Sequence, residues 1–194
     1  NNSMTWDTWF YDNSLPACLE FAGTRVFING DTLINLLTYS KISGFNATNI
    51  TPMPCPVWAF DNTIIQDFAF LREDTTLQKV WAFDPNLGTE YLLFDFSLMP
   101  GDTLITSSIT LSGQDTMIVD SVDVIQLLDG SFRKIIHMHH IVGIFMQEFM
   151  IEGVGGAAGM YLPPINWGMG TETYLGCVIY NNDQLYNPTA FSTY

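Results

Sequence analysis

The chain has 194 residues, of which 47% are hydrophobic and only 13% are charged, against the ~25% charged residues usual in soluble domains. This length suits one domain with one buried core. The 20 acidic and 6 basic residues give a net charge of −14, so too few cations are present to neutralise phosphates. We therefore expect no nucleic-acid partner and no contact with anionic membrane surfaces. The longest apolar run, Ile141–Met146, contains Gly143 and falls far short of the ~20 residues of a membrane-spanning helix, so we expect no membrane insertion.

In chain order, short runs of branched and aromatic residues alternate with turn-forming residues, which predicts strands and almost no helix. Residues 32–39 also fit a short helix, because Asp31 is a suitable N-cap before the leucines. We expect one all-β domain over residues 1–194, an antiparallel β-sandwich or barrel-like meander with at most short helices, in which residues 1–12 form an aromatic strand or a docking arm. The expected strands are Trp6–Tyr11, Arg25–Ile28, Thr32–Tyr39, Thr63–Leu71, Gln78–Phe83, Glu90–Phe96, Thr103–Leu111, Thr116–Val119, Val122–Leu128, Phe132–Ile141, Phe145–Glu152 and Tyr174–Tyr180.

Turn-forming residues set the connections between these strands. The segment 70–104 contains three apolar runs separated by turn formers, which predicts an antiparallel meander. Asp129-Gly130 between two apolar runs predicts a hairpin with a type I′ turn, whose two central residues need positive φ. Residues 43–56 and 153–173, rich in Asn, Thr, Pro or Gly, are expected to be the least regular.

Several strings occur in an order that resembles a known family. They are GDTLIN and YSK within residues 30–41, FLREDTTLQKVW at 70–81, YLLFDFSLMPGDTL at 91–104, DSV and LLDGSFRKIIHM within 120–138, FMIEGVGGAAGMYLPP at 149–164 and YLGCVIYNNDQLY at 174–186. As an ordered set they resemble the secreted domain placed ahead of a type IX secretion sorting signal in proteins of Bacteroidota. The chain departs from this family in ending at Tyr194 without a sorting domain, and in reading GVGG at 153–156 where the family has GIGS.

The resemblance implies a secreted, extracellular or cell-surface protein, and the start at Asn1 rather than Met fits removal of a signal segment. Members of this family have no assigned enzymatic role, so no catalytic residue carries over. The resemblance also implies O-glycosylation at Asp-Ser or Asp-Thr followed by Leu, Val, Met or Thr. The alternative is ordinary turn chemistry, because Asp-Thr is common in turns. The matching positions are Thr32, Thr75, Thr103, Thr116 and Ser121.

Histidines provide the first candidate for chemistry. On a strand, His137 and His139 point to one face and could supply two imidazoles to a metal. A third ligand would come from a neighbouring strand, with Glu148 or Glu152 the nearest acidic residues. A polar strand face with solvated histidines explains the same pattern without a metal, and we expect neither metal nor cofactor.

Other motifs give little support for catalysis. Residues 153–158 formally satisfy GxGxxG/A, but Pro163-Pro164 soon follows in place of the long helix that a dinucleotide site requires, so a tight turn or bulge is expected. No GxSxG, HExxH or GxxxxGK[ST] motif occurs. A hydrolase built from two distant carboxylates is a third functional hypothesis, and a non-enzymatic protein is expected.

The three cysteines lie far apart and form no CxxC pair. Cys18 and Cys55 both lie beside prolines, in expected loops, and are the preferred disulfide pair. Cys177 lies in an expected strand and is interpreted as a core residue. Three reduced cysteines are the alternative.

Aromatic residues provide the last candidate surface. Trp6, Trp9, Phe10 and Tyr11 crowd the amino-terminal segment, and Trp167 lies near the other end. We expect them to contact a neighbouring subunit by β-augmentation, or to stack on a carbohydrate, or to pack on their own domain. The first hypothesis is a structural protein that self-associates, for example as a fibre subunit. The alternative is an adhesion or glycan-binding module.

Overall fold

The computed structural model describes residues 4–12, 20–49, 58–108, 113–141, 147–160 and 171–187. All regular elements in these ranges are strands, and every pairing between them is antiparallel. The prediction of an all-β antiparallel fold is therefore confirmed. These ranges contain no helix of the length and hydropathy needed to cross a membrane.

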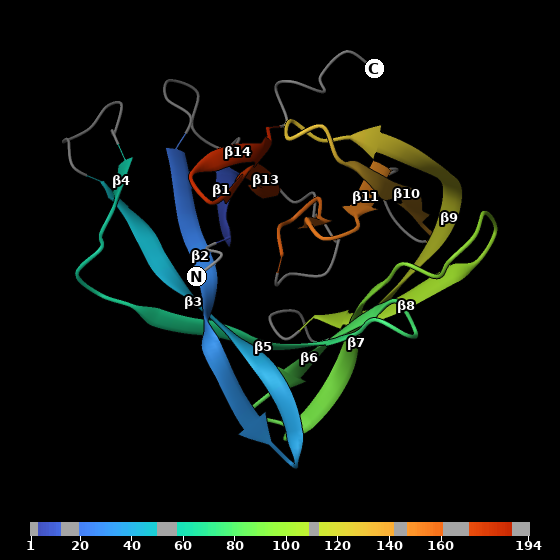
Figure 1. Ribbon diagram of the computed structural model, residues 1–194, viewed down its shortest axis with the longest axis horizontal. Helices are drawn as coiled ribbons and strands as arrows, with labels where there is room; N and C mark the ends of the chain where they lie inside the picture. Colours follow the sequence, from blue (N-terminus) through green and yellow to red (C-terminus); the bar gives the residue numbers. More distant parts are fainter. Residues whose placement is uncertain are drawn as a thin grey trace.

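The strands form two sheets (Figure 1). The larger sheet has the order β14-β13-β1-β2-β3-β5-β6-β7, with β4 paired to β3. Its strands are β1 (Met4–Asp12), β2 (Glu20–Ile34), β3 (Leu37–Asn49), β4 (Trp58–Phe60), β5 (Gln66–Asp74), β6 (Lys79–Asp84), β7 (Thr89–Asp95), β13 (Thr171–Tyr180) and β14 (Asp183–Tyr186). The smaller sheet has the order β12-β11-β10-β9-β8, with β8 (Thr103–Ser108), β9 (Gly113–Gln126), β10 (Phe132–His140), β11 (Gln147–Ile151) and β12 (Gly155–Gly156).

The larger sheet curls around the smaller one, so that the fold is sandwich-like with a half-barrel on one side (Figure 1). β7 and β8 lie side by side where the two sheets meet, and the Thr106 hydroxyl donates a hydrogen bond of 3.0 Å to the carbonyl oxygen of Leu92. The Lys134 ammonium donates to the carbonyl oxygen of Phe96 at 2.8 Å. These side chains join the sheets where no strand pairing does.

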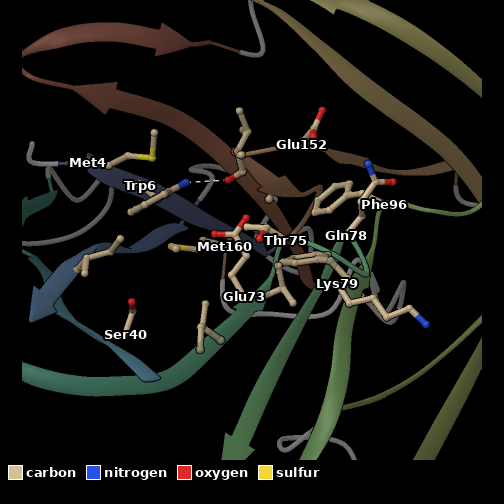
Figure 2. A pocket seen from close by; sticks show the side chains of 17 residues that line it. Met4, Trp6, Ser40, Glu73, Thr75, Gln78, Lys79, Phe96, Glu152 and Met160 are labelled. Atoms are coloured by element: carbon tan, nitrogen blue, oxygen red, sulfur yellow. Dashed lines mark hydrogen bonds between the residues drawn. The ribbon is translucent and has the colours of Figure 1, made fainter. Parts of the chain in front are cut away.

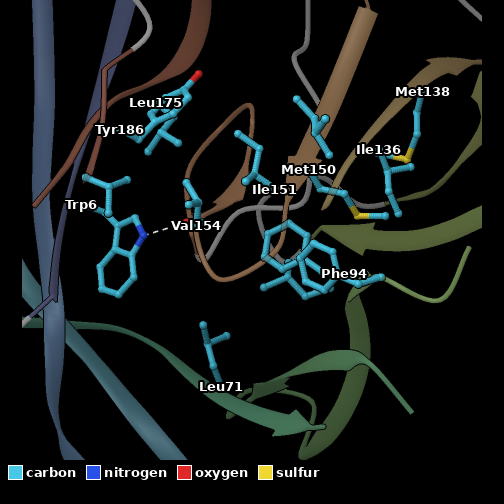
Figure 3. Close-up of a cluster of buried hydrophobic side chains, with 14 of the residues drawn as sticks. Trp6, Leu71, Phe94, Ile136, Met138, Met150, Ile151, Val154, Leu175 and Tyr186 are labelled. Atoms are coloured by element: carbon cyan, nitrogen blue, oxygen red, sulfur yellow. Dashed lines mark hydrogen bonds between the residues drawn. The ribbon is translucent and has the colours of Figure 1, made fainter. Parts of the chain in front are cut away.

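The core fills the space between the two sheets (Figure 3). Trp6 of β1 and Leu71 of β5 approach from the larger sheet, while Ile136 of β10 and Met150 of β11 approach from the smaller sheet. All four side chains are buried, and each such burial contributes about 1.5–3 kcal/mol of hydrophobic stabilisation. The alternation of apolar and polar residues along the strands therefore selects which face points inward.

Two of the predicted connections form, whereas the break expected between Thr116–Val119 and Val122–Leu128 does not, because both segments lie in β9. β5, β6 and β7 form the antiparallel meander expected for residues 70–104. The Asp129-Gly130 hairpin between β9 and β10 also forms, but the predicted type I′ turn is wrong. Only Gly130 of the pair has a positive φ, 82°, and its N–H donates to the carbonyl oxygen of Leu127 at 3.0 Å. The loop is therefore a type I turn that ends in a left-handed glycine, which Asp-Gly satisfies equally well.

Two expectations about residues 30–56 are corrected. Thr32–Tyr39 is neither a single strand nor a helix, because the chain reverses at Asn35-Leu36 between β2 and β3. Residues 43–49, expected to be irregular, continue β3. β3 pairs with β5 as far as Gly44, with β2 as far as Asn46 and with β4 from Ala47 to Asn49, and this pairing outweighs the weak strand propensity of its Gly, Asn and Ser residues.

The glycine-rich loop after β11 is a tight turn, as predicted. Gly153, Gly155 and Gly159 all have positive φ, and the loop packs against β1. A Cβ on Gly155 would lie 2.9 Å from the carbonyl oxygen of Gly159, and a Cβ on Gly159 would lie 2.7 Å from the Thr8 hydroxyl. The glycines therefore allow close approach of backbone, and residues 153–160 contain no helix to receive a pyrophosphate.

Candidate functional site

The tip of the β2–β3 hairpin is the first candidate site. We call residues 31–38 the hairpin tip; it forms the lowest point of the molecule in Figure 1. The pairing of β2 with β1 stops at Phe27 and that of β3 with β5 stops at Ser40, so within the described part of the chain this segment is a two-stranded ribbon. It exposes Leu33 and Leu36 at 66% and 89% of their surface, and Leu37 is also exposed.

The turn at this tip has an unusual residue. Asn35 and Leu36 have φ values of 51° and 67°, and positive φ at both central positions defines a type I′ turn. Asn-Gly is the preferred pair there, because a large side chain in the left-handed region meets its own backbone. Leucine at this position costs about 1 kcal/mol or more and leaves an apolar side chain in water. Neither feature helps the domain to fold.

The base of the tip is firmly attached to the sheet. A bulge between Ile28 and Asp31, with Gly30 at a φ of 73°, bends β2 just before the tip. On β3, the buried Tyr39 packs on Phe83 with ring centroids 5.7 Å apart. The Tyr39 hydroxyl donates to Glu90 Oε1 at 2.7 Å. The ribbon therefore leaves the body from a fixed point and in a fixed direction.

Glu90 joins this anchor to a cation. Arg72 donates from Nε and Nη2 to the two carboxylate oxygens of Glu90, at 2.8 and 3.0 Å. This bidentate bond is the main cause of the lowered pKa of Glu90, and the Tyr39 hydroxyl lowers it further. Arg72 also lies over the Trp81 ring, 5.9 Å from its centroid. The charged groups of this cluster are paired with one another, so the cluster holds structure rather than a ligand.

The second candidate is a cavity of about 350 Å³ at the inner side of the larger sheet (Figure 2). We call it the apolar cavity. Ligand pockets commonly start at ~300 Å³, so a small group fits inside. Its apolar lining includes Trp6, Leu71, Val80, Phe94, Phe96 and Val154. Its polar lining includes Ser40, Glu73, Thr75, Gln78, Lys79 and Glu152.

The lining of the cavity has more acidic than basic side chains. The Lys79 ammonium forms an ion pair with Asp95 at 3.1 Å, and in Figure 2 its side chain extends away from the other labelled residues. Glu73 and Glu152 form no ion pair with any residue that the structure describes. The cavity therefore offers apolar walls with two carboxylates that still accept hydrogen bonds.

The predicted histidine pair does not assemble a metal site. His137 and His139 alternate along β10 with buried residues, but Nδ1 of His139 lies at hydrogen-bond distance, 2.7 Å, from Oδ1 of Asp120. Glu148 lies opposite Met138 in the register and points to the buried face, where its Oε1 is 3.7 Å from Nε2 of His140. Glu152 lines the apolar cavity. The proposed third ligands therefore lie on the wrong face, and the described residues contain no group of three metal-ligating side chains.

The amino-terminal aromatic strand forms, but it is not a docking arm. β1 pairs with β2 along one edge and with β13 along the other, so it has no free edge to offer a second chain. Trp6 is only 2% exposed, and its Nε1–H donates to the carbonyl oxygen of Val154 at 2.7 Å. Trp6 therefore packs on its own domain, which was one of the three alternatives, and a second molecule could meet its ring only as part of the wall of the apolar cavity. Trp167 and the side chains of Trp9, Phe10 and Tyr11 lie outside the described part of the structure.

Cys177 lies on the outer face of β13 rather than in the core. Its thiol donates to Asp7 Oδ2 at 3.3 Å, and Arg25 makes a bidentate bond to the same carboxylate at 2.7 Å. Burial, together with the Asp7 charge, raises the pKa of Cys177 to about 12, so this half-buried thiol stays protonated at neutral pH. The predicted disulfide partners Cys18 and Cys55 lie outside the described residues.

The glycosylation candidates differ in accessibility. Thr75 and Thr103 are exposed, while Thr32, Thr116 and Ser121 are half-buried. Ser121 also donates to Asp123 Oδ2 at 2.9 Å. Thr75 and Thr103 are thus the positions that a modifying enzyme reaches most readily, and Thr75 lines the apolar cavity.

Sequence reasoning missed both candidate sites. The leucines of the tip have helical spacing as well as strand character, and an Asn-Leu pair is a weak turn signal. Residues of the cavity come from strands far apart in the chain, so only the tertiary fold brings them together. In comparisons with known proteins, no family model, no curated protein and no solved structure matches this chain.

Proposed function

We propose that the protein is a non-enzymatic structural subunit that self-associates, and that the hairpin tip makes the contact. The observation that carries this proposal is Leu36, which is 89% exposed and held at a φ of 67°. A strained backbone that presents an apolar side chain to water is a cost to the isolated domain. Burial of that side chain in a contact between chains recovers the hydrophobic free energy, about 1.5–3 kcal/mol for one leucine.

Electrostatics support a contact at this place. The whole chain carries a net charge of −14, so two copies repel each other over most of their surfaces. Within the hairpin tip, Asp31 is the only charged residue. A contact made through the tip therefore receives little charge from the chain that contributes the tip. Because added salt screens the remaining repulsion, association is expected to strengthen as ionic strength rises.

The resemblance to secreted Bacteroidota domains supports an extracellular or cell-surface setting. Assembly outside the cell is consistent with a surface that is poor in charge and rich in Thr, Ser and Asn. Mass spectrometry of the native protein tests the associated modification. Glycopeptides that contain Thr75 or Thr103 are expected, and unmodified peptides at all five candidate positions would remove this part of the proposal.

Sedimentation velocity over a range of concentrations tests self-association. We expect the wild-type chain to form larger species as concentration rises, and Leu36→Gly to weaken association about 10- to 100-fold. Leu87→Gly is a matched control, because Leu87 is also an exposed leucine in a hairpin turn, between β6 and β7. This control should assemble like the wild type. A wild-type chain that stays monomeric at the highest attainable concentration, or a Leu36→Gly chain that assembles normally, would refute the proposal.

An adhesion or glycan-binding module is the second candidate, and the apolar cavity favours it. Phe94 and Phe96 supply aromatic walls, while Gln78 and Thr75 supply hydrogen-bonding groups in the same cavity. Sugars use such a combination of stacking and polar contacts. Gln78→Ala should lose retention on a glycan array that binds the wild type. No binding by the wild type to any glycan would rule out this second candidate.

A further inference from the structure

We propose that the hairpin tip of one copy docks in the apolar cavity of a second copy, with Leu36 as the side chain that enters it. This inference rests on the proposed self-association and names the partner surface. The tip is an apolar projection and the cavity an apolar recess of about 350 Å³, and both belong to the same chain. A projection that fits a recess elsewhere on an identical molecule links copies one after another.

A copy cannot fill its own cavity with its own tip. Ser40 lines the cavity and lies on the same strand as Leu37, which follows Leu36 at the turn. A strand advances ~3.3 Å per residue, so four residues carry Leu36 roughly 13 Å beyond Ser40. The two strands of the ribbon stay paired from Asp31↔Ser40 to Ile34↔Leu37, so the turn does not fold back toward the cavity. Leu36 therefore reaches outward and is available only to another molecule.

The polar groups of the two surfaces are also compatible. Asn35 precedes Leu36 in the turn, and its carboxamide is a hydrogen-bond donor. Glu73 and Glu152 lie at the cavity and form no ion pair with a described residue, so their oxygens can accept from such a donor. Asp31, the one charge in the tip, accepts a hydrogen bond from Ser40 at 3.1 Å on its own chain.

Charge argues against two alternatives: a lipid surface as the partner of the tip, and an anionic ligand in the cavity. A lipid surface is a poor partner for the tip, because residues 31–38 contain no Lys, Arg, Trp or Tyr to anchor it at a membrane interface and the chain carries −14. An anionic ligand is a poor occupant of the cavity, since Lys79 is paired with Asp95 and the remaining charges are carboxylates. An uncharged apolar projection from a second copy is compatible with the carboxylates at the cavity and needs no membrane anchor in the tip.

The size of the contact sets its expected strength. One hairpin tip covers much less than the ~1,200 Å² of a small specific interface. A single tip-to-cavity contact is therefore expected to be weak and visible only at high protein concentration. Repeated contacts along a chain of copies, or a reciprocal exchange of tips between two copies, would raise the overall affinity by multivalency.

Mixing two different variants tests this contact directly. Leu36→Gly removes the docking side chain but keeps the cavity, whereas Thr75→Trp fills the cavity but keeps the tip. Thr75 is exposed in the turn between β5 and β6, and its neighbour Thr76 is exposed but does not line the cavity, so Thr76→Trp is the matched control. Ser40→Tyr fills the cavity from β3 as a second variant. A glycan on Thr75 would occupy the same space, so chains that assemble through the cavity are expected to carry a glycan at Thr103 rather than at Thr75, and the experiment uses unglycosylated protein.

We expect Leu36→Gly and Thr75→Trp each to lose association about 10- to 100-fold when alone, while Thr76→Trp assembles like the wild type. At a protein concentration high enough to reveal a single contact, an equimolar mixture of the two defective variants should form one-to-one pairs in sedimentation velocity, because each pair joins one intact tip to one intact cavity. Circular dichroism verifies that each variant is folded, and Ser40→Tyr replaces Thr75→Trp if the latter is not. Suppose that the wild type and Thr76→Trp assemble but that the mixture stays monomeric with either cavity-filling variant. The tip then docks elsewhere, so this inference is wrong, while the proposed self-association stands. A monomeric wild type overturns both.

Discussion

Two apolar regions of this molecule, the core around Trp6 and the hairpin tip around Leu36, differ in every respect except composition. The Trp6 ring is 2% exposed, and its one polar atom donates to the carbonyl oxygen of Val154. The Leu36 side chain is 89% exposed, and its backbone is in the left-handed region. The first region is explained by folding alone. The second is a cost to the isolated domain that the proposed self-association would offset.

This difference shows where function is to be sought in a chain without catalytic motifs. Buried apolar residues are the ordinary outcome of folding, and single exposed ones are common on any protein surface. An exposed leucine that also strains its backbone is different, since glycine in that place would remove both costs. The informative feature is therefore the conflict between local preference and observed structure.

Replacement of Trp6 by alanine should lower the free energy of unfolding more than any other change considered, because Trp6 lies in the core. Removal of this buried ring leaves a void and deprives the Val154 carbonyl of its donor, so we expect a loss of about 3–5 kcal/mol in the free energy of unfolding. Urea denaturation followed by circular dichroism measures it. Trp6→Phe is the control that keeps most of the volume, and its loss should be smaller. A Trp6→Ala chain as stable as the wild type would show that the ring is not part of the core.

Glu90→Gln tests how the base of the hairpin tip is attached to the body of the domain. Its effect on the free energy of unfolding should be smaller than that of Trp6→Ala. Arg72 and Tyr39 hold the pKa of Glu90 below its ordinary value, so the folded state favours the carboxylate. This stabilisation is complete above the pKa of Glu90 in the unfolded chain and is lost as pH falls through the lower folded value. At neutral pH, Glu90→Gln should therefore cost about 1–2 kcal/mol, since a charged hydrogen-bond acceptor is replaced by a neutral one.

Unfolding curves of the wild type and of Glu90→Gln at several pH values measure this effect. The difference in stability should shrink as pH falls into the acid range, and a difference that is equal at all pH values would contradict the assignment. Amide exchange adds a spatial test, because Tyr39 anchors the base of the ribbon through Glu90. Residues 31–38 should exchange faster in the variant, while amides around Trp6 should be unaffected.

The sequence was sufficient to predict the strands and turns that build the core. Alternating runs, together with turn formers such as Asp84-Pro85-Asn86, correctly predicted the meander of β5, β6 and β7. Asp129-Gly130 correctly predicted a hairpin, although not its turn type. Such local patterns work because an inward face and a tight turn both impose residue choices on consecutive positions.

The tip and the cavity were not predictable in the same way. No rule of local preference assigns a positive φ to Leu36, so the turn at Asn35-Leu36 was hidden inside an expected strand. The faces of Glu148 and Glu152 depend on the register between β10 and β11, which one sequence does not reveal. Likewise, the cavity depends on how the larger sheet curls over the loop at 152–155.

The smallest expected effect is the change in the free energy of unfolding caused by Leu36→Gly. It is also the sharpest test of whether the tip differs from the core. At concentrations low enough to keep every chain monomeric, we expect this change to stabilise the fold by about 1 kcal/mol, because glycine after Asn35 suits a type I′ turn. The extra freedom of glycine in the unfolded chain offsets part of this gain. Leu36→Ala separates the two properties of the residue, since alanine removes the apolar side chain but keeps the strained φ. Its stability should be close to that of the wild type, and its association should be as weak as that of Leu36→Gly. A Leu36→Gly chain that unfolds more easily than the wild type would mean that the leucine packs within its own chain, and the tip would then belong with the core rather than with a partner.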